Sequence, residues 1–120
     1  MSTEVIRVGN ALDFGHLPLS AAVRLAETVH TAGVLPVDPS TGEVVGTTIE
    51  EQARIALNNL SAILYSAGSA LDRVGIVRIY LADIAADLDG FNDVYAEFFA
   101  RHHPARYALG LSLIHISEPT

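Results

Sequence analysis

The sequence predicts one domain that combines helices and strands, of the α/β or α+β class. Half of its 120 residues are apolar and 18% are charged, which suits a single hydrophobic core and makes a second domain unexpected. Short segments rich in β-branched residues alternate with two stretches of helical periodicity. The predicted order is therefore strand, hairpin, helix, strand and helix, with a final stretch left unassigned.

The first third of the chain has the pattern of short strands. Residues 4–8 (EVIRV) are rich in β-branched side chains and are followed by a Gly-Asn pair, which is typical of a strand that ends in a turn. Apolar and polar residues alternate again at 23–25 and 29–31, and we interpret these segments as two paired strands. Ala26 and Glu27 would form the loop between them. The lack of glycine there is unfavourable for a tight two-residue turn.

The first helix is marked at both ends. Thr47 with Glu50 and Thr48 with Glu51 both have the capping-box spacing, and Gly68 can supply a left-handed C-terminal cap. The apolar residues between these ends form one stripe at helical spacing: Ile49, Ala53, Ala56, Leu57, Leu60, Ile63, Leu64 and Ala67.

A strand and a second helix follow. Residues 74–83 alternate apolar with polar side chains, which predicts a strand with one face in the core. The next apolar residues recur at helical spacing: Leu88, Phe91, Tyr95, Phe98 and Phe99. Asp87 or Asp89 can cap this helix, and Pro104 prevents its continuation.

The composition narrows the function classes. The net charge of −7 disfavours nucleic acid and anionic membrane surfaces as partners. All seven basic residues are arginine, which excludes Schiff-base chemistry and the lysine of a phosphate-binding loop. There is no cysteine, no apolar run of roughly 20 residues and no signal-peptide pattern at the start, so we expect a soluble cytoplasmic protein.

The spacing of the histidines predicts no metal site. His102 and His103 are adjacent, so their side chains would diverge on a helix, and His16 and His30 have no carboxylates at ligand spacing. A Ser/His/Asp triad remains open, although no G-x-S-x-G motif is present. By composition Arg106 is an ordinary surface charge.

Three blocks of sequence together resemble the RidA/YjgF family, the reactive intermediate deaminases. They are TAGVLPVDPSTGEVVG, EEQARIALNNLSAIL and FNDVYAEFFARHHPAR. The resemblance implies an α+β, chorismate-mutase-like fold, in which a mixed sheet packs against two helices, and a homotrimer with clefts between protomers. It also implies hydrolysis of enamines and imines such as 2-aminoacrylate to 2-keto acids and ammonia, without a cofactor.

The resemblance also suggests site residues. The family's Pro-Ala-Arg corresponds to residues 104–106, and its arginine binds the substrate carboxylate, for which a planar guanidinium offers two parallel donors. Asn92 matches the asparagine of the family's N-x-x-Y-x-x-F-F helix, and a solvated polar residue is the alternative. Gly33 matches the glycine beside the substrate, and an ordinary strand-end glycine is the alternative.

The chain departs from the family pattern at several of these positions. Leu19 stands where many members have tyrosine, and Ala32 stands where they have serine, so two hydroxyls are lost. Ala108 replaces a frequent cysteine and can still offer its backbone N–H. The family's acid on the last strand falls about fifteen residues after the arginine, which here passes the last residue of the sequence, and we do not transfer its role to Glu118.

Residues 111–120 (LSLIHISEPT) break with the preceding composition and resemble a translated sequencing-adapter artefact. We therefore expect one RidA-like domain at residues 1–110 and a non-native tail at 111–120 that replaces the last strand; a native edge strand is the alternative. With this tail we expect weak turnover and some aggregation.

Two functions follow from these observations. The first is a deaminase of the 2-iminobutanoate/2-iminopropanoate type, and the alternative is a non-catalytic 2-keto acid-binding or regulatory trimer. A ribonuclease role is disfavoured by the acidic charge and the absence of lysine.

Overall fold

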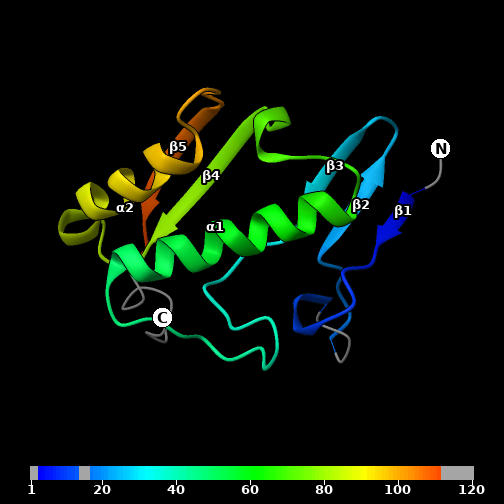
Figure 1. The fold of residues 1–120 in the computed structure, drawn as a ribbon, viewed down its shortest axis with the longest axis horizontal. Coiled ribbons are helices and arrows are strands. Elements are labelled where there is room, and N and C mark those ends of the chain that lie inside the picture. Colours follow the sequence, from blue (N-terminus) through cyan, green and yellow to red (C-terminus); the bar gives the residue numbers. More distant parts are fainter. Residues whose placement is uncertain (1–2, 14–16, 112–120) are drawn as a thin grey trace, which may run out of the picture.

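The computed structural model describes residues 3–13 and 17–111, and it confirms the α+β class. Two helices pack beside strands that run both antiparallel and parallel (Figure 1). The elements in chain order are β1 Thr3–Ile6, η1 Ala11–Asp13, β2 Ala22–Leu25, β3 Thr28–Thr31, α1 Ile49–Ser66, η2 Leu71–Arg73, β4 Ile76–Leu81, α2 Ile84–Phe98 and β5 Ala105–Gly110.

The strands form two hydrogen-bonded groups within the described residues. β1, β2 and β3 pair antiparallel in that order, and β4 pairs with β5 in parallel. The hairpin predicted at 23–31 is confirmed, and its loop is the tight pair Ala26 and Glu27. Ala26 takes the positive φ of 56° that such a loop requires, although it is not glycine.

Both ends of α1 are fixed by local hydrogen bonds. Thr48 is the N-cap, and its side chain accepts from the Glu51 N–H at 3.2 Å. The Glu51 carboxylate accepts from the Thr47 N–H at 2.8 Å. At the other end Gly68 has φ of 77°, and Ser69 N–H donates to the Leu64 carbonyl at 2.8 Å. These bonds select the second of the two predicted capping boxes and confirm the glycine cap.

The second helix begins earlier than its sequence pattern indicates. The predicted caps Asp87 and Asp89 are wrong, because Asp83 is the N-cap and its side chain accepts from the Ala86 N–H at 3.2 Å. Asp83 lies one turn nearer the strand, so β4 ends at Leu81; it begins at Ile76, two residues later than predicted. α2 ends at Phe98, before Pro104 as expected.

Two hydrophobic clusters make up the core, and α1 contributes to both. Its C-terminal residues Ile63 and Ala67 pack with the β1–β3 side, whereas Ala53 and Leu57 pack with β4 and α2. Figure 1 shows α1 crossing the molecule between these two regions. The long helix therefore connects strand groups that share no hydrogen-bonded pair in the described residues.

The two faces of the β4–β5 pair differ. Ile79 and Leu81 are buried against the helices, so the alternate residues point away from them. That outer face carries exposed apolar side chains: Ile76 at 51%, Tyr80 at 51%, Tyr107 at 40% and Leu109 at 49% exposure.

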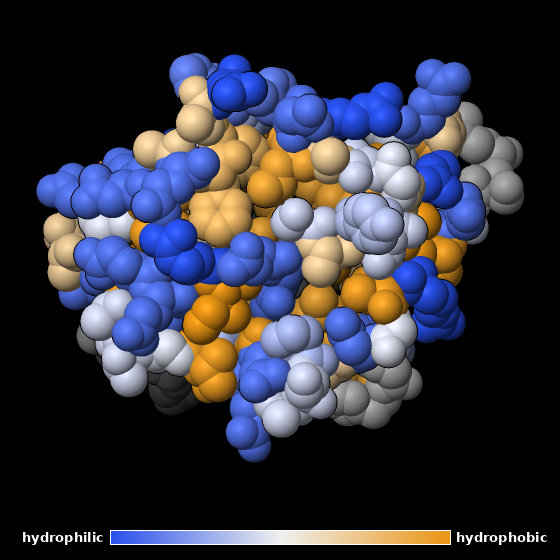
Figure 2. All heavy atoms as spheres, viewed as in Figure 1, coloured by the Kyte–Doolittle hydropathy of each residue, from blue (hydrophilic) through white to orange (hydrophobic). Residues whose placement is uncertain are grey.

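On the side of the molecule shown in Figure 2, polar side chains dominate and apolar ones show between them.

Among the described residues, no helix is long and apolar enough to cross a membrane. The expected non-native tail lies outside the described residues, apart from Leu111.

Candidate functional site

Arg106 lies on the inner face of β5. The parallel register pairs it with Val77, and it pairs Ala108, two residues further on, with the buried Ile79. Residues paired in this way share a face of the sheet, so the Arg106 side chain points toward the helices and is half-buried. The expectation from composition, an ordinary surface charge, is wrong for this arginine.

The Arg106 guanidinium is held by two residues of α2. Its Nη2 donates to Asn92 Oδ1 at 2.7 Å. Its Cζ lies over the Tyr95 ring, 4.7 Å from the centroid. Asn92 and Tyr95 are three residues apart and therefore lie on the same side of the helix. The structure thus brings together Arg106 and Asn92, which the sequence analysis names separately.

The free edge of β5 presents backbone amides next to this arginine. Ala105 N–H donates to the Gly75 carbonyl and Leu111 N–H donates to the Leu81 carbonyl, so the odd-numbered amides point toward β4. In a parallel ladder the amides alternate in direction, and the Ala108 N–H therefore points to the opposite edge. No other described strand pairs with that edge, so this N–H is free to donate to a ligand.

The remaining predicted residues lie elsewhere in the chain. Leu19 precedes β2 and is 46% exposed. Ala32 and Gly33 follow β3, and the Ala32 N–H donates to the Ala21 carbonyl at 2.8 Å. A Cβ at Gly33 would meet nothing within 4 Å. Figure 1 shows β3 well separated from β5, so one chain does not bring these three residues to Arg106.

One buried polar residue was missed by sequence reasoning. Asn59 is 4% exposed, and its Nδ2 donates to the carbonyls of Leu35 and Val37 at 3.1 and 2.8 Å. It fixes the segment that follows Ala32 and Gly33. The sequence does contain a signal for its burial: Asn59 lies three residues after Ala56, at the margin of the apolar stripe of this helix.

Tyr95, like Asn59, was missed as a residue of the site by sequence reasoning. Its ring packs with the core aromatic residues, as its helical spacing predicts, and it also contacts Arg106. Its buried hydroxyl has no hydrogen-bond partner among the described residues. Burial raises the pKa of this hydroxyl, and the Arg106 charge opposes that effect.

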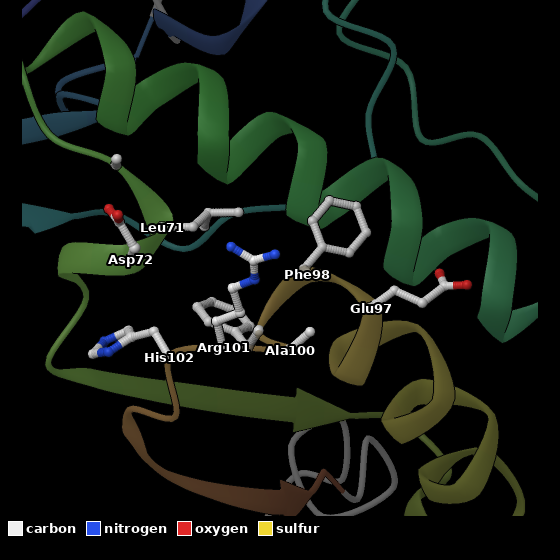
Figure 3. A pocket seen from close by; sticks show the side chains of 9 residues that line it. Leu71, Asp72, Glu97, Phe98, Ala100, Arg101 and His102 are labelled. Carbon is white, nitrogen blue, oxygen red and sulfur yellow. The ribbon is translucent and has the colours of Figure 1, made fainter.

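A pocket of about 420 Å³ lies at the C-terminal end of α2, between that helix and η2. Figure 3 shows Arg101 reaching between Leu71 and Phe98, with Asp72 and Glu97 at opposite ends. Glu97 is paired with Arg54 of α1 at 2.7 Å. None of the residues predicted for the site lines this pocket.

Two of the described histidines, His30 and His102, have local partners. His102 Nε2 hydrogen-bonds the Val74 carbonyl, and His30 Nε2 lies 3.0 Å from the Thr28 hydroxyl. Across residues 3–13 and 17–111, no three His, Asp or Glu side chains gather as a metal site would require.

Comparison with known proteins gives the family. The sequence model described as endoribonuclease L-PSP matches residues 14–117. A RutC family protein of Saccharolobus solfataricus is 41% identical over 95 residues, which are 79% of this chain and 75% of that protein. Human 2-iminobutanoate/2-iminopropanoate deaminase is 36% identical over 91 residues, 76% of this chain and 66% of the human one.

The fold comparison agrees with the sequence comparison. A solved structure of an L-PSP-type protein from Entamoeba histolytica has a TM-score of 0.85 and 34% identity, and the match covers 92% of this chain and 87% of that one. The match of the family model over most of the chain and the shared fold together show that this protein belongs to the endoribonuclease L-PSP family, which is the RidA/YjgF family that its sequence resembles.

Proposed function

We propose that this protein hydrolyses reactive enamines and imines such as 2-aminoacrylate to 2-keto acids and ammonia, and that Arg106 binds the substrate carboxylate. The observation that carries the proposal is the half-buried Arg106 guanidinium, oriented by Asn92 at 2.7 Å. Membership of the family and the likeness to the human deaminase support the reaction class.

The chemistry uses few protein groups. The guanidinium pairs with the carboxylate and orients the small acid. The Ala108 N–H, at the free edge of β5, can donate to the imine nitrogen or to the oxygen formed from water. 2-Aminoacrylate first tautomerises to its imine, with a proton moving from nitrogen to C3. Water then adds to C2 of the imine, the C–N bond of the resulting carbinolamine breaks, and ammonia leaves. For 2-aminoacrylate, one water consumed gives pyruvate and one ammonia, and no electrons are exchanged.

The cleft is proposed to form between protomers of a homotrimer in the cytoplasm. Leu19, Ala32 and Gly33 lie apart from Arg106 within one chain, so a second copy is needed to bring them together. The apolar outer face of β4 and β5 supports self-association, because four exposed apolar side chains on one sheet face would be covered. Light scattering should give three times the monomer mass; a monomer at micromolar concentration would contradict the trimer.

The test of the carboxylate role compares two arginines of the same region. Arg106→Ala should lower kcat/KM for 2-aminoacrylate, generated in situ and followed by keto acid release, by about 10- to 150-fold, since a hydrogen bond to a charged group contributes about 1.5–3 kcal/mol. Arg101→Ala is the control, because Arg101 is exposed and makes no contact with Asn92. Equal rates for the wild type and Arg106→Ala would refute the proposal.

The alternative, a non-catalytic 2-keto acid-binding trimer, is motivated by the hydroxyls lost at Leu19 and Ala32. Calorimetry that shows 2-oxobutanoate binding without turnover would select it. We expect no binding of RNA, since a chain of net charge −7 without lysine repels a phosphate backbone.

A further inference from the structure

Tyr95 lies where it can control the geometry of Arg106. Its ring receives the guanidinium Cζ at 4.7 Å from the centroid, and Asn92 accepts from Nη2 one helical turn away. Contact with the ring face uses none of the N–H groups of the guanidinium. The arginine is therefore restrained while its unused donors stay available to a carboxylate.

The ring itself is anchored in the core. It stacks on Phe99 with centroids 4.6 Å apart and planes at 29°, and it lies 5.9 Å from the Phe91 ring. Phe91 and Phe99 are 8% and 3% exposed. A continuous series of contacts thus runs from two buried aromatic residues through Tyr95 to the charged group.

The tyrosine hydroxyl does not explain this arrangement. It is buried and has no partner in the described part of the chain, which costs free energy. The contact with Arg106 involves the ring face instead. The two parts of the side chain therefore make separable contributions that substitution can distinguish.

We propose that Tyr95 is a positioning residue whose ring holds the Arg106 guanidinium in the orientation that receives the substrate carboxylate. The inference rests on the proposed function. An unrestrained arginine loses rotamer freedom when it binds a ligand, so restraint beforehand raises affinity. Tyr95 acts only through Arg106, and its loss should weaken carboxylate binding more than it slows the chemical step.

The test measures 2-oxobutanoate affinity by calorimetry, together with KM and kcat for 2-aminoacrylate. Tyr95→Leu should raise Kd and KM by roughly 3- to 30-fold, as expected for loss of a cation–π contact, with a smaller change in kcat. Tyr95→Phe keeps the ring and should bind within about twofold of the wild type. Phe98→Leu is the matched control, since it removes a half-buried aromatic ring of the same helix that is not in contact with Arg106.

A second variant covers the case in which Tyr95→Leu does not fold. Incorporating 3,4,5-trifluorophenylalanine at position 95 keeps the ring shape and withdraws electron density, so its Kd should lie above that of Tyr95→Phe. Equal Kd values for these two ring variants would overturn the proposal. So would wild-type affinity in a folded Tyr95→Leu, or equal weakening by Tyr95→Phe and Tyr95→Leu.

The failure of the underlying function looks different. If the wild type and Arg106→Ala bind 2-oxobutanoate equally, or neither binds it, then the carboxylate role of Arg106 is wrong and the positioning role fails with it. If Arg106→Ala abolishes binding and the ring variants do not change it, only the role of Tyr95 is wrong.

Discussion

Replacing Asn59 with alanine should destabilise the fold far more than the same change at its neighbour Asn58. Asn59 is 4% exposed and donates to two carbonyls, whereas the neighbouring Asn58 is exposed. The Val37 carbonyl lies in a buried residue, so losing its donor costs about 1–3 kcal/mol, and the more exposed Leu35 carbonyl adds about 0.5 kcal/mol. The sum is about 1.5–3.5 kcal/mol.

Thermal unfolding followed by circular dichroism measures this difference directly. For a domain of this size, about 1.5–3.5 kcal/mol corresponds to a fall in Tm of roughly 6–14 °C. Asn58→Ala should stay within about 0.5 kcal/mol of the wild type. Both variants make the same change in helix propensity, so their difference isolates the buried hydrogen bonds. Equal Tm values for the two would refute the reasoning, and Asn59→Asp should be at least as unstable as Asn59→Ala, since it replaces the donor with an acceptor facing two carbonyls.

The caps and the tight loop give three smaller predictions. The Thr47 backbone N–H, followed by its hydroxyl, holds the pKa of Glu51 below its ordinary value. Charged Glu51 therefore stabilises the protein above pH about 4.3, and the stabilisation is lost as the pH falls through the depressed pKa. Chemical denaturation should show Glu51→Gln less stable than the wild type at pH 7, with a difference that shrinks as the pH falls below about 4.3; a constant difference would contradict the cap. Gly68→Ala should cost about 1 kcal/mol, because φ of 77° is unfavourable for alanine. Ala26→Gly should leave Tm unchanged or slightly higher, because relief at φ of 56° offsets the added chain entropy; a fall of several degrees would show that the loop is not strained.

The helices were predictable because their signals are local. A capping box, an apolar stripe and a left-handed glycine each depend on residues within a few positions, and all three describe α1. The start of α2 shows the limit of such signals. Several aspartates near its beginning can each cap a helix, and the packing of β4 decides that Asp83 does so.

The last strand and the site depend on contacts between distant segments. β5 (ARYALG) has no strong alternation of its own, since its inner face carries an arginine, an alanine and a glycine. It forms a strand because β4 offers a parallel edge and α2 covers one side. For the same reason neither the half-burial of Arg106 nor its contact with Tyr95 follows from composition. The resemblance supplied Arg106 and Asn92 as separate candidates, and the fold supplies their contact.

A subunit-mixing experiment tests whether the proposed cleft is shared between protomers. Arg106→Ala removes the proposed carboxylate partner on β5, and Gly33→Val places a side chain in the proposed other half of the cleft. Within one chain a Cβ at Gly33 meets nothing within 4 Å, so this variant should fold. Each variant alone should keep at most about a tenth of the wild-type activity. In trimers reassembled at random from equal amounts of both, about a quarter of the clefts combine an intact Arg106 with an intact Gly33, so activity should return to about a quarter of the wild-type value. If both halves of the site come from the same chain, no mixture of these two variants can regain activity, and the shared cleft would be excluded.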